Sequence, residues 1–225
     1  MLSLIIAESS LERVPAKITG HPSVTSMAKR FGKYPGRMLL DKSWHFGAMS
    51  YMDEKERRGR PDIVHLCMLM ACGTPLYMKD LLHVYVHTAE DKVIEVGKRV
   101  RMPKSYHRFV GLMEDLYLDG RIKDDSGHML VEIFDSDLTT LLERIEPDIL
   151  TGLSTIGYPS TYGRVASRFD GCSDGCIVIG GFPKGHFSDK TVSNLDEMYS
   201  VPGGSQDAHV ILSRILYEYE ATALE

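Results

Sequence analysis

Residues 176–187 read CIVIGGFPKGHF, a β-branched run that passes directly into a glycine-rich loop. The apolar part is typical of a buried strand in a parallel sheet, and small ligands bind where loops leave the carboxyl ends of such strands. The glycines, at the first, second and sixth loop positions, do not fit the dinucleotide fingerprint, and His186 and Phe187 stand where a P-loop has Lys and Ser or Thr. The segment predicts a ligand loop that does not bind a triphosphate; a tight turn at a strand end is the alternative interpretation.

Strand and helix patterns alternate along the rest of the chain. We expect further strands at residues 2–7, 37–41, 83–87, 92–96, 129–134, 148–153 and 191–200. We expect helices at 44–52, 63–72, 106–119, 138–145 and 208–219, and a loop at 20–36. The alternation favours a single α/β domain over residues 1–225 with a mainly parallel sheet, from which residues 20–60 form an excursion.

Three predicted strand ends in the last third of the chain are rich in glycine or serine. They are Leu153–Ser154, Gly180–Gly185 and Ser200–Gly204. Carboxyl ends of parallel strands share one edge of a sheet, so we expect these segments to meet. Their backbone amides could hold an adenosine-like ligand there.

The composition is that of an ordinary globular protein, with 225 residues, 43% hydrophobic and 25% charged. Neither a membrane-spanning apolar run nor a secretory signal is recognisable, which predicts a soluble cytoplasmic protein. Cys67, Cys72, Cys172 and Cys176 lack zinc-site spacing and are expected to be core thiols, although Cys172 and Cys176 could form a redox pair. The pair His83 and His87 lacks a third ligand nearby, so no metal is expected. Hydrolase, metalloprotease and kinase signatures are missing.

The charge is unevenly distributed along the chain. Residues 1–108 contain 18 Lys and Arg against 11 Asp and Glu, whereas residues 109–225 contain 8 against 20. Between Glu95 and Glu114 five cations occur without one acidic residue. Clustered cations of this kind bind phosphate backbones with release of counterions, and an ordinary solvated face is the alternative.

Two short segments concentrate this positive charge. Arg57, Arg58 and Arg60 precede Pro61 and Asp62, which are favourable residues for a helix start. Because the helix dipole disfavours cations there, we expect these arginines to serve an anionic partner.

The second segment contains Arg101, Lys104 and Arg108 around the start of the next helix. Lys104 and Arg108 can share one side of that helix. Tyr106 and His107 between them could stack on unpaired bases, or simply pack.

Together these segments resemble the small-subunit rRNA pseudouridine N1-methyltransferases, a branch of the SPOUT (α/β knot) methyltransferases that acts in ribosome biogenesis. The resemblance rests on segments in one order along most of the chain. These are Leu40-Asp41, His45, Ala48-Met49, Arg58–His65, Val84–Thr88, Arg101–Lys104, Arg108-Phe109, Gly111–Met113 and Ile179–Gly185.

The resemblance implies a homodimer with a C-terminal trefoil knot whose loops bind S-adenosylmethionine. The implied cofactor-binding residues are Leu153, Gly180, Gly185, His186, Phe187, Tyr199, Ser200, Val201, Pro202, Gly203 and Gly204. The implied rRNA contacts are Arg60, Arg101, Lys104 and Arg108. Lys104 stands where the family often has arginine. Asp62 is the candidate carboxylate for removing the proton from pseudouridine N1, and a helix-start role is its alternative.

The sequence therefore predicts S-adenosylmethionine-dependent N1-methylation of a pseudouridine in small-subunit rRNA. One alternative is a non-catalytic assembly factor that binds rRNA through the same cations. Another is a knotted methyltransferase that acts on tRNA.

Overall fold

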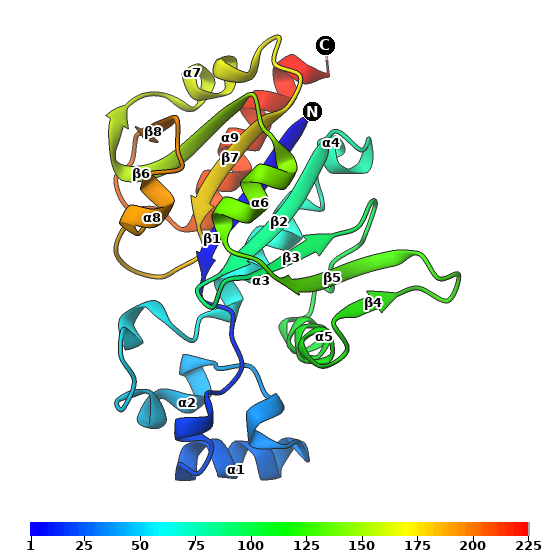
Figure 1. The fold of residues 1–225 in the computed structure, drawn as a ribbon, viewed down its shortest axis with the longest axis vertical. Helices are drawn as coiled ribbons and strands as arrows, with labels where there is room; N and C mark the ends of the chain where they lie inside the picture. Colours follow the sequence, from blue (N-terminus) through cyan, green and yellow to red (C-terminus); the bar gives the residue numbers. More distant parts are fainter. Residues whose placement is uncertain (225) are drawn as a thin grey trace.

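The computed structural model describes residues 1–224, which form an α/β fold around one eight-stranded sheet (Figure 1). The strand order is β4-β5-β3-β2-β1-β7-β6-β8. The strands are β1 (Leu2–Ser9), β2 (Leu82–Thr88), β3 (Lys92–Val96), β4 (Arg121–Lys123), β5 (Met129–Asp135), β6 (Ile149–Pro159), β7 (Gly175–Gly180) and β8 (Glu197–Ser200).

Helices surround this sheet and build an extension beside it. They are α1 (Pro22–Phe31), α2 (Lys42–Met49), α3 (Pro61–Ala71), α4 (Pro75–Met78), α5 (Tyr106–Asp119), α6 (Leu138–Ile145), α7 (Tyr162–Ala166), α8 (Asp189–Val192) and α9 (Ala208–Ala223). Short 3-10 turns lie at Ala16–Ile18, Pro35–Arg37, Lys55–Arg57 and Ser167–Phe169.

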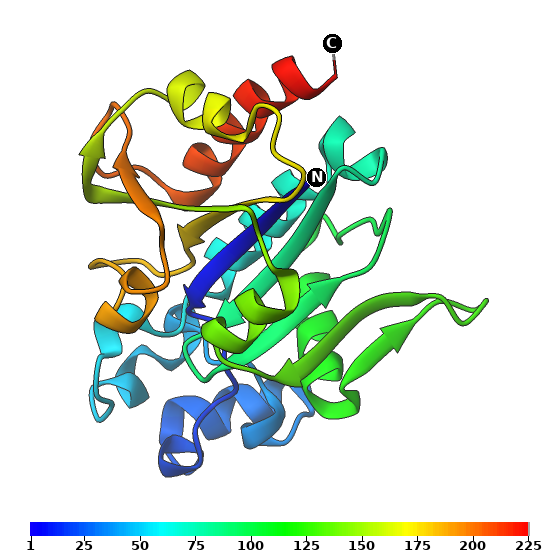
Figure 2. The same ribbon diagram turned by 45° about the horizontal axis from the view of Figure 1, so that its top comes forward.

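Strand β1 lies in the middle of the sheet and is apolar on both faces. Leu2, Leu4 and Ile6 belong to a core cluster with α3, α5 and α9, whereas Ile5 and Ala7 belong to another with α6. This alternation follows from the two-residue period of a strand. The sheet is therefore covered on both sides, and Figure 2 shows α6 on one side with α3 and α9 on the other.

The two halves of the sheet differ in strand direction. Strands β2, β1, β7, β6 and β8 run parallel, whereas β3, β5 and β4 continue the sheet in antiparallel pairs. The prediction of a mostly parallel α/β sheet is confirmed. The parallel half brings the carboxyl ends of β1, β7, β6 and β8 to one edge, where a ligand site is expected.

The extension, residues 10–60, contains a helix that was not expected. Residues 20–36 were predicted as a loop, but α1 spans Pro22–Phe31. Pro22 is at the helix start, Gly32 ends the helix at φ 63°, and Val24 and Ala28 face a small core formed with α2. The proline and glycine suggested a loop, although here they mark the two helix boundaries.

One predicted strand was wrong, and another was predicted too long. Residues 37–41 form a single bridge, between Leu39 and Arg13. In residues 191–200 only β8 is a strand, because Ser188 caps α8 through Thr191 N–H and starts a helix first. In addition, β6 continues six residues beyond Leu153 and pairs with β8 a second time at Tyr158.

Within residues 1–224 no helix is long and apolar enough to cross a membrane.

Candidate functional site

Two of the three predicted segments, Leu153–Ser154 and Gly180–Gly185, meet around one crevice. The cavity has a volume of about 140 Å³. Its walls come from the middle of β6, the end of β7 with the loop after it, the segment between β8 and α9, and the first residues of α9. They are lined by Leu153, Ser154, Thr155, Ile179, Gly180, Phe182, Pro183, Lys184, Gly185, His186, Phe187, Ser205, Gln206, Ala208 and Ile211.

The predicted cofactor residues divide into two groups. Those of the first two loops, Leu153, Gly180, Gly185, His186 and Phe187, all line the crevice. The predicted third-loop residues, Tyr199 to Gly204, do not line it, and Ser205 and Gln206 take their place.

The reason lies in the packing of β8 and the residue after it. Tyr199 lies in β8 and donates its hydroxyl hydrogen to Glu197, and Val201 is buried in the core. The loop reaches the crevice only after the two glycines, Gly203 and Gly204, which both have positive φ. Gln206 could have been suspected from its place between these glycines and α9.

The crevice fits a ligand with one flat apolar part and several hydrogen-bond acceptors. Its walls combine apolar side chains with bare backbone, as small-ligand sites do. Within residues 1–224 the N–H groups of Gly185 and Phe187 have no hydrogen-bond partner, so they can donate to a ligand. The volume is below the ~300 Å³ at which sites for drug-sized ligands begin. A ligand as large as S-adenosylmethionine would therefore extend beyond this volume.

Arg60 and Asp62 form a bidentate ion pair at the start of α3. Arg60 Nε and Nη2 each donate to an Asp62 carboxylate oxygen at 2.8 Å. This hydrogen-bonded pairing raises the pKa of Arg60, and Asp207 at the start of α9 adds to the shift. Asp207 follows the third loop directly, but neither Arg60 nor Asp62 lines the crevice. Asp62 is therefore placed to orient the guanidinium of Arg60.

The second basic segment is held firmly while its cations stay exposed. His65 of α3 contacts the carbonyl of Pro103 at 2.7 Å and stacks on Phe109, which is fully buried. Tyr106 donates to Asp41 of the extension. Arg101, Lys104 and Arg108 are exposed and form no ion pair within residues 1–224. Contacts within the protein thus account for the position of Tyr106, while the three cations remain available to a partner.

The arginines that precede α3 have partners within the protein. Arg57 pairs with Glu8 at 2.6 Å, and Arg58 forms a bidentate pair with Glu12, whose side chain is 4% exposed. The expectation that Arg57 and Arg58 serve an external anion is corrected, because their anionic partners are these two carboxylates. The pairs join segments 46 and 49 residues apart, so the local sequence does not reveal them.

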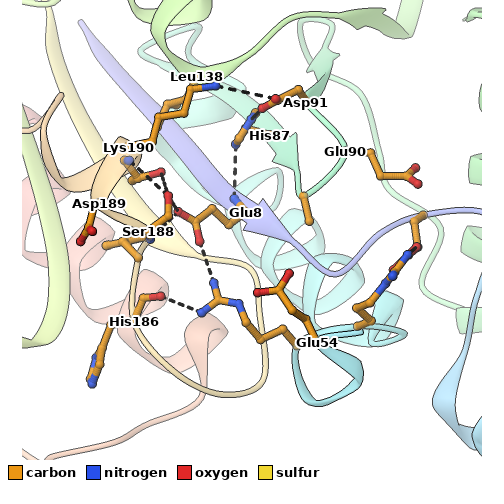
Figure 3. A pocket seen from close by; sticks show the side chains of 16 residues that line it. Glu8, Glu54, His87, Glu90, Asp91, Leu138, His186, Ser188, Asp189 and Lys190 are labelled. Atoms are coloured by element: carbon orange, nitrogen blue, oxygen red, sulfur yellow. Dashed lines mark hydrogen bonds and ion pairs between the residues drawn. The ribbon is translucent and has the colours of Figure 1, made fainter. Parts of the chain in front are cut away.

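A second, larger cavity of about 610 Å³ lies on the other side of the loop that follows β7 (Figure 3). His186 and Phe187 line both cavities and so form a wall between them. Glu8 stands in the middle of the view, between Ser188 and the extension. Its carboxylate accepts from Ser188 N–H and Oγ and from Arg57.

Other candidate ligands are in structural positions. His87 Nδ1 accepts from Glu8 N–H, and its Nε2 contacts Asp91 at 3.1 Å. Residues 1–224 contain no cluster of three or more side chains suited to a metal ion. All four cysteines are free; Cys176 is buried, which raises the pKa of its thiol, whereas Cys172 is partly exposed and contacts Asp148.

The chain is similar to known methyltransferases over nearly its whole length. The EMG1/NEP1 methyltransferase family matches residues 4–220. "Ribosomal RNA small subunit methyltransferase Nep1" of Thermococcus onnurineus is 36% identical over 98% of each chain. The protein of that name from Archaeoglobus fulgidus is 39% identical over 97% of this chain and 95% of the relative. A crystal structure of Archaeoglobus fulgidus Nep1 bound to S-adenosylhomocysteine superposes with a TM-score of 0.87 at 35% identity and covers 99% of both chains. Sequence and structure agree over the full length, and the chain belongs to the EMG1/NEP1 methyltransferase family.

Proposed function

We propose that this protein transfers the methyl group of S-adenosylmethionine to N1 of a pseudouridine in small-subunit rRNA. The observation that carries the proposal is the crevice beside β6, the end of β7 and the segment between β8 and α9, with unpartnered N–H groups at Gly185 and Phe187. The relatives named for small-subunit rRNA methylation, one of them bound to S-adenosylhomocysteine, support both the cofactor and the class of substrate.

In this proposal the cofactor supplies an activated methyl group, and the protein aligns the acceptor nitrogen with it. Backbone groups of the three loops hold the cofactor, with Leu153 and Ile179 as apolar walls. The exposed Gly203 and Gly204 of the third loop give it the freedom to close over the ligand. Exclusion of water by this closure favours in-line transfer.

The acceptor N1 of neutral pseudouridine carries a proton that must leave. Asp62 is the candidate acceptor, and its oxygens are bound by Arg60. Comparison of Asp62→Asn with wild type over a pH series tests this role. A general base predicts a large loss of kcat that rising pH relieves, whereas a purely orienting role predicts a loss that does not change with pH.

The rRNA-binding surface in this proposal comprises Arg101, Lys104 and Arg108, Arg60 beside them, and part of the extension. The extension is suited to unpaired RNA because it exposes several aromatic rings among cations. These are Phe31, Tyr34, Trp44, Phe46 and Tyr51. Arg30 lies over the ring of Trp44 and Lys42 over that of Phe46. Exposed rings stack on splayed bases while cations hold the backbone.

The test is transfer of a radiolabelled methyl group to two rRNA fragments that differ only in one base, pseudouridine or uridine. We expect label only in the pseudouridine fragment. Equal labelling of both fragments would refute N1 of pseudouridine as the target. A tRNA competitor should leave the labelling unchanged. Heat on titration with S-adenosylhomocysteine separates an enzyme from an assembly factor that lacks a cofactor.

The trefoil knot, the homodimer and the cytoplasmic location expected from the resemblance also belong to this proposal. Strand β8, the last in the sequence, pairs with β6 on the side away from β7. This position is compatible with a knot in which the C-terminal part of the chain passes through an earlier loop. Sedimentation equilibrium tests the dimer: a mass of twice 25.2 kDa is expected, and a single-chain mass would contradict it.

A further inference from the structure

Arg57 is the only described residue of the extension whose side chain donates to the backbone of the loop after β7. Its Nη1 donates to the carbonyl of His186 at 2.7 Å and, at a longer 3.5 Å, to that of Lys184. The guanidinium also lies 3.9 Å from the centre of the Phe182 ring. A single side chain thus touches three residues of the loop after β7, of which His186 also lines both cavities.

The loop is built to accept this side chain. Gly185 has φ +91°, which few side-chain-bearing residues adopt, and a Cβ there would lie 2.8 Å from Arg57 Nη1. The glycine is therefore required both by its backbone conformation and by the close approach of Arg57.

A second set of contacts, with Glu8, holds the side chain of Arg57 in place. Its Nη2 donates to Glu8 Oε2, while Glu8 Oε1 accepts from Ser188 N–H and Oγ (Figure 3). Glu8 has φ +50°, an unfavourable conformation for a residue other than glycine. A strained conformation of this kind persists where surrounding contacts hold the residue. The bonds from Ser188 to Glu8 also hold the end of the loop after β7 in place.

The carbonyl contacts decide where the N–H groups of the loop point. The chain has no cis peptide bonds among its described residues, and in a trans peptide the C=O and the following N–H point in opposite directions. Since the carbonyls of Lys184 and His186 face Arg57, the N–H groups of Gly185 and Phe187 face away from it. Like the N–H groups of Phe182, Lys184 and His186, these two N–H groups have no hydrogen-bond partner among the described residues, and both residues line the crevice.

We propose that Arg57 is a positioning residue for the cofactor: it holds two carbonyls of the loop and thereby turns the N–H groups of Gly185 and Phe187 toward the crevice. The inference rests on the proposed function, because it takes the crevice to be the S-adenosylmethionine site. It gives Arg57 a role distinct from rRNA binding.

The test compares two matched substitutions in neighbouring residues. Arg57→Lys keeps the positive charge beside Glu8. It loses the planar guanidinium, whose separate N–H groups reach both the carboxylate and the loop carbonyls. Arg58→Lys makes the same chemical change beside Glu12, where no contact with the loop exists among the described residues. The affinity of each protein for S-adenosylhomocysteine is measured by calorimetry, and thermal unfolding reports on folding.

We expect Arg57→Lys to bind S-adenosylhomocysteine about tenfold more weakly than wild type, the loss typical of a charge-assisted hydrogen bond, and Arg58→Lys to bind within about twofold. The KM for S-adenosylmethionine should rise with the same factor, while kcat at saturation changes little. Addition of S-adenosylhomocysteine should shift the amide resonances of Gly185 and Phe187 in the wild type.

The possible outcomes separate this inference from the proposed function. Equal affinities of the two lysine variants, whether both are weak or both unchanged, would overturn the role of Arg57 while the cofactor site stands. A wild-type protein that binds no S-adenosylhomocysteine would overturn the proposed function and this inference with it.

Discussion

The two basic segments of the chain use their cations in opposite ways. In the segment before α3, Arg57, Arg58 and Arg60 are each paired with a carboxylate of the same chain. In the segment at 101–108, all three predicted RNA contacts are exposed without such a partner within residues 1–224. Each segment contains three of these cations, so their number alone does not distinguish a structural cation from one available to a phosphate. The distribution of acidic residues in space makes the difference.

Among the substitutions that test this difference between the two basic segments, Arg58→Ala is expected to have the largest effect, on the free energy of unfolding. The substitution leaves Glu12 buried without its partner, and loss of one member of a buried pair is costly. Because Arg58 is 22% exposed, we expect a loss of about 2–3 kcal/mol in the free energy of unfolding, somewhat below the fully buried range. Urea unfolding measures it.

The matched control is Arg101→Ala, which should change the free energy of unfolding by less than about 0.5 kcal/mol, as surface substitutions usually do. Similar losses in the two variants would mean that both segments are structural.

A second, smaller effect concerns RNA. Arg101→Ala should weaken binding of an rRNA fragment about tenfold and reduce the slope of log K against log salt by about 0.7, as expected for one lost contact with single-stranded phosphate. Affinity for S-adenosylhomocysteine should not change. Fluorescence anisotropy at several salt concentrations gives the slope; an unchanged slope would show that Arg101 contacts no phosphate.

The comparison also shows which parts of the site a sequence can reveal. The apolar run ending at Gly180 identified a central strand, because a strand that is buried on both faces has apolar residues at every position. The amphipathic pattern of α5 correctly placed Phe109 in the core. Such features depend on neighbours along the chain.

The features that the sequence did not reveal depend on residues far apart. Glu8 and Glu12 belong to β1 and the residues just after it, and nothing local connects them with Arg57 and Arg58. The predicted third-loop residues, Tyr199 to Gly204, do not line the crevice, and the burial of Val201 is set by the α9 side of the core. Helix α1 was missed because its buried face contains only Val24 and Ala28.

A third prediction refines the exposed segment. Lys104→Arg adds a planar fork that can bind a phosphate bidentately, in place of a point charge. Because the site is exposed, we expect a gain in rRNA affinity of only about two- to fivefold, the range of exposed ion pairs. Anisotropy measures it, and His107→Ala tests whether the neighbouring exposed ring contributes independently. Weaker binding by Lys104→Arg would indicate that the size of the side chain, and not its charge, limits the contact of residue 104 with the rRNA.

The smallest effect is expected beside the paired segment, at Glu90. Burial raises the pKa of its carboxyl, and the nearby charge of Glu12 raises it further, although Arg58 opposes the shift. Because the folded state binds this proton more tightly than the unfolded state, its contribution to stability is complete below the unfolded pKa. That contribution is lost as pH rises through the higher folded pKa.

Glu90→Gln removes the titration and should therefore be more stable than wild type at pH 7, by at most about 0.5 kcal/mol, because the residue is exposed at the surface and its carboxyl is only partly desolvated. Below pH 4 the two proteins should agree, because Glu90 is then protonated in both states. Urea unfolding at both pH values measures the difference. A gain that persists at low pH would mean that the amide makes a new contact, and a loss at pH 7 would mean that Glu90 helps to neutralise Arg58 rather than repelling Glu12.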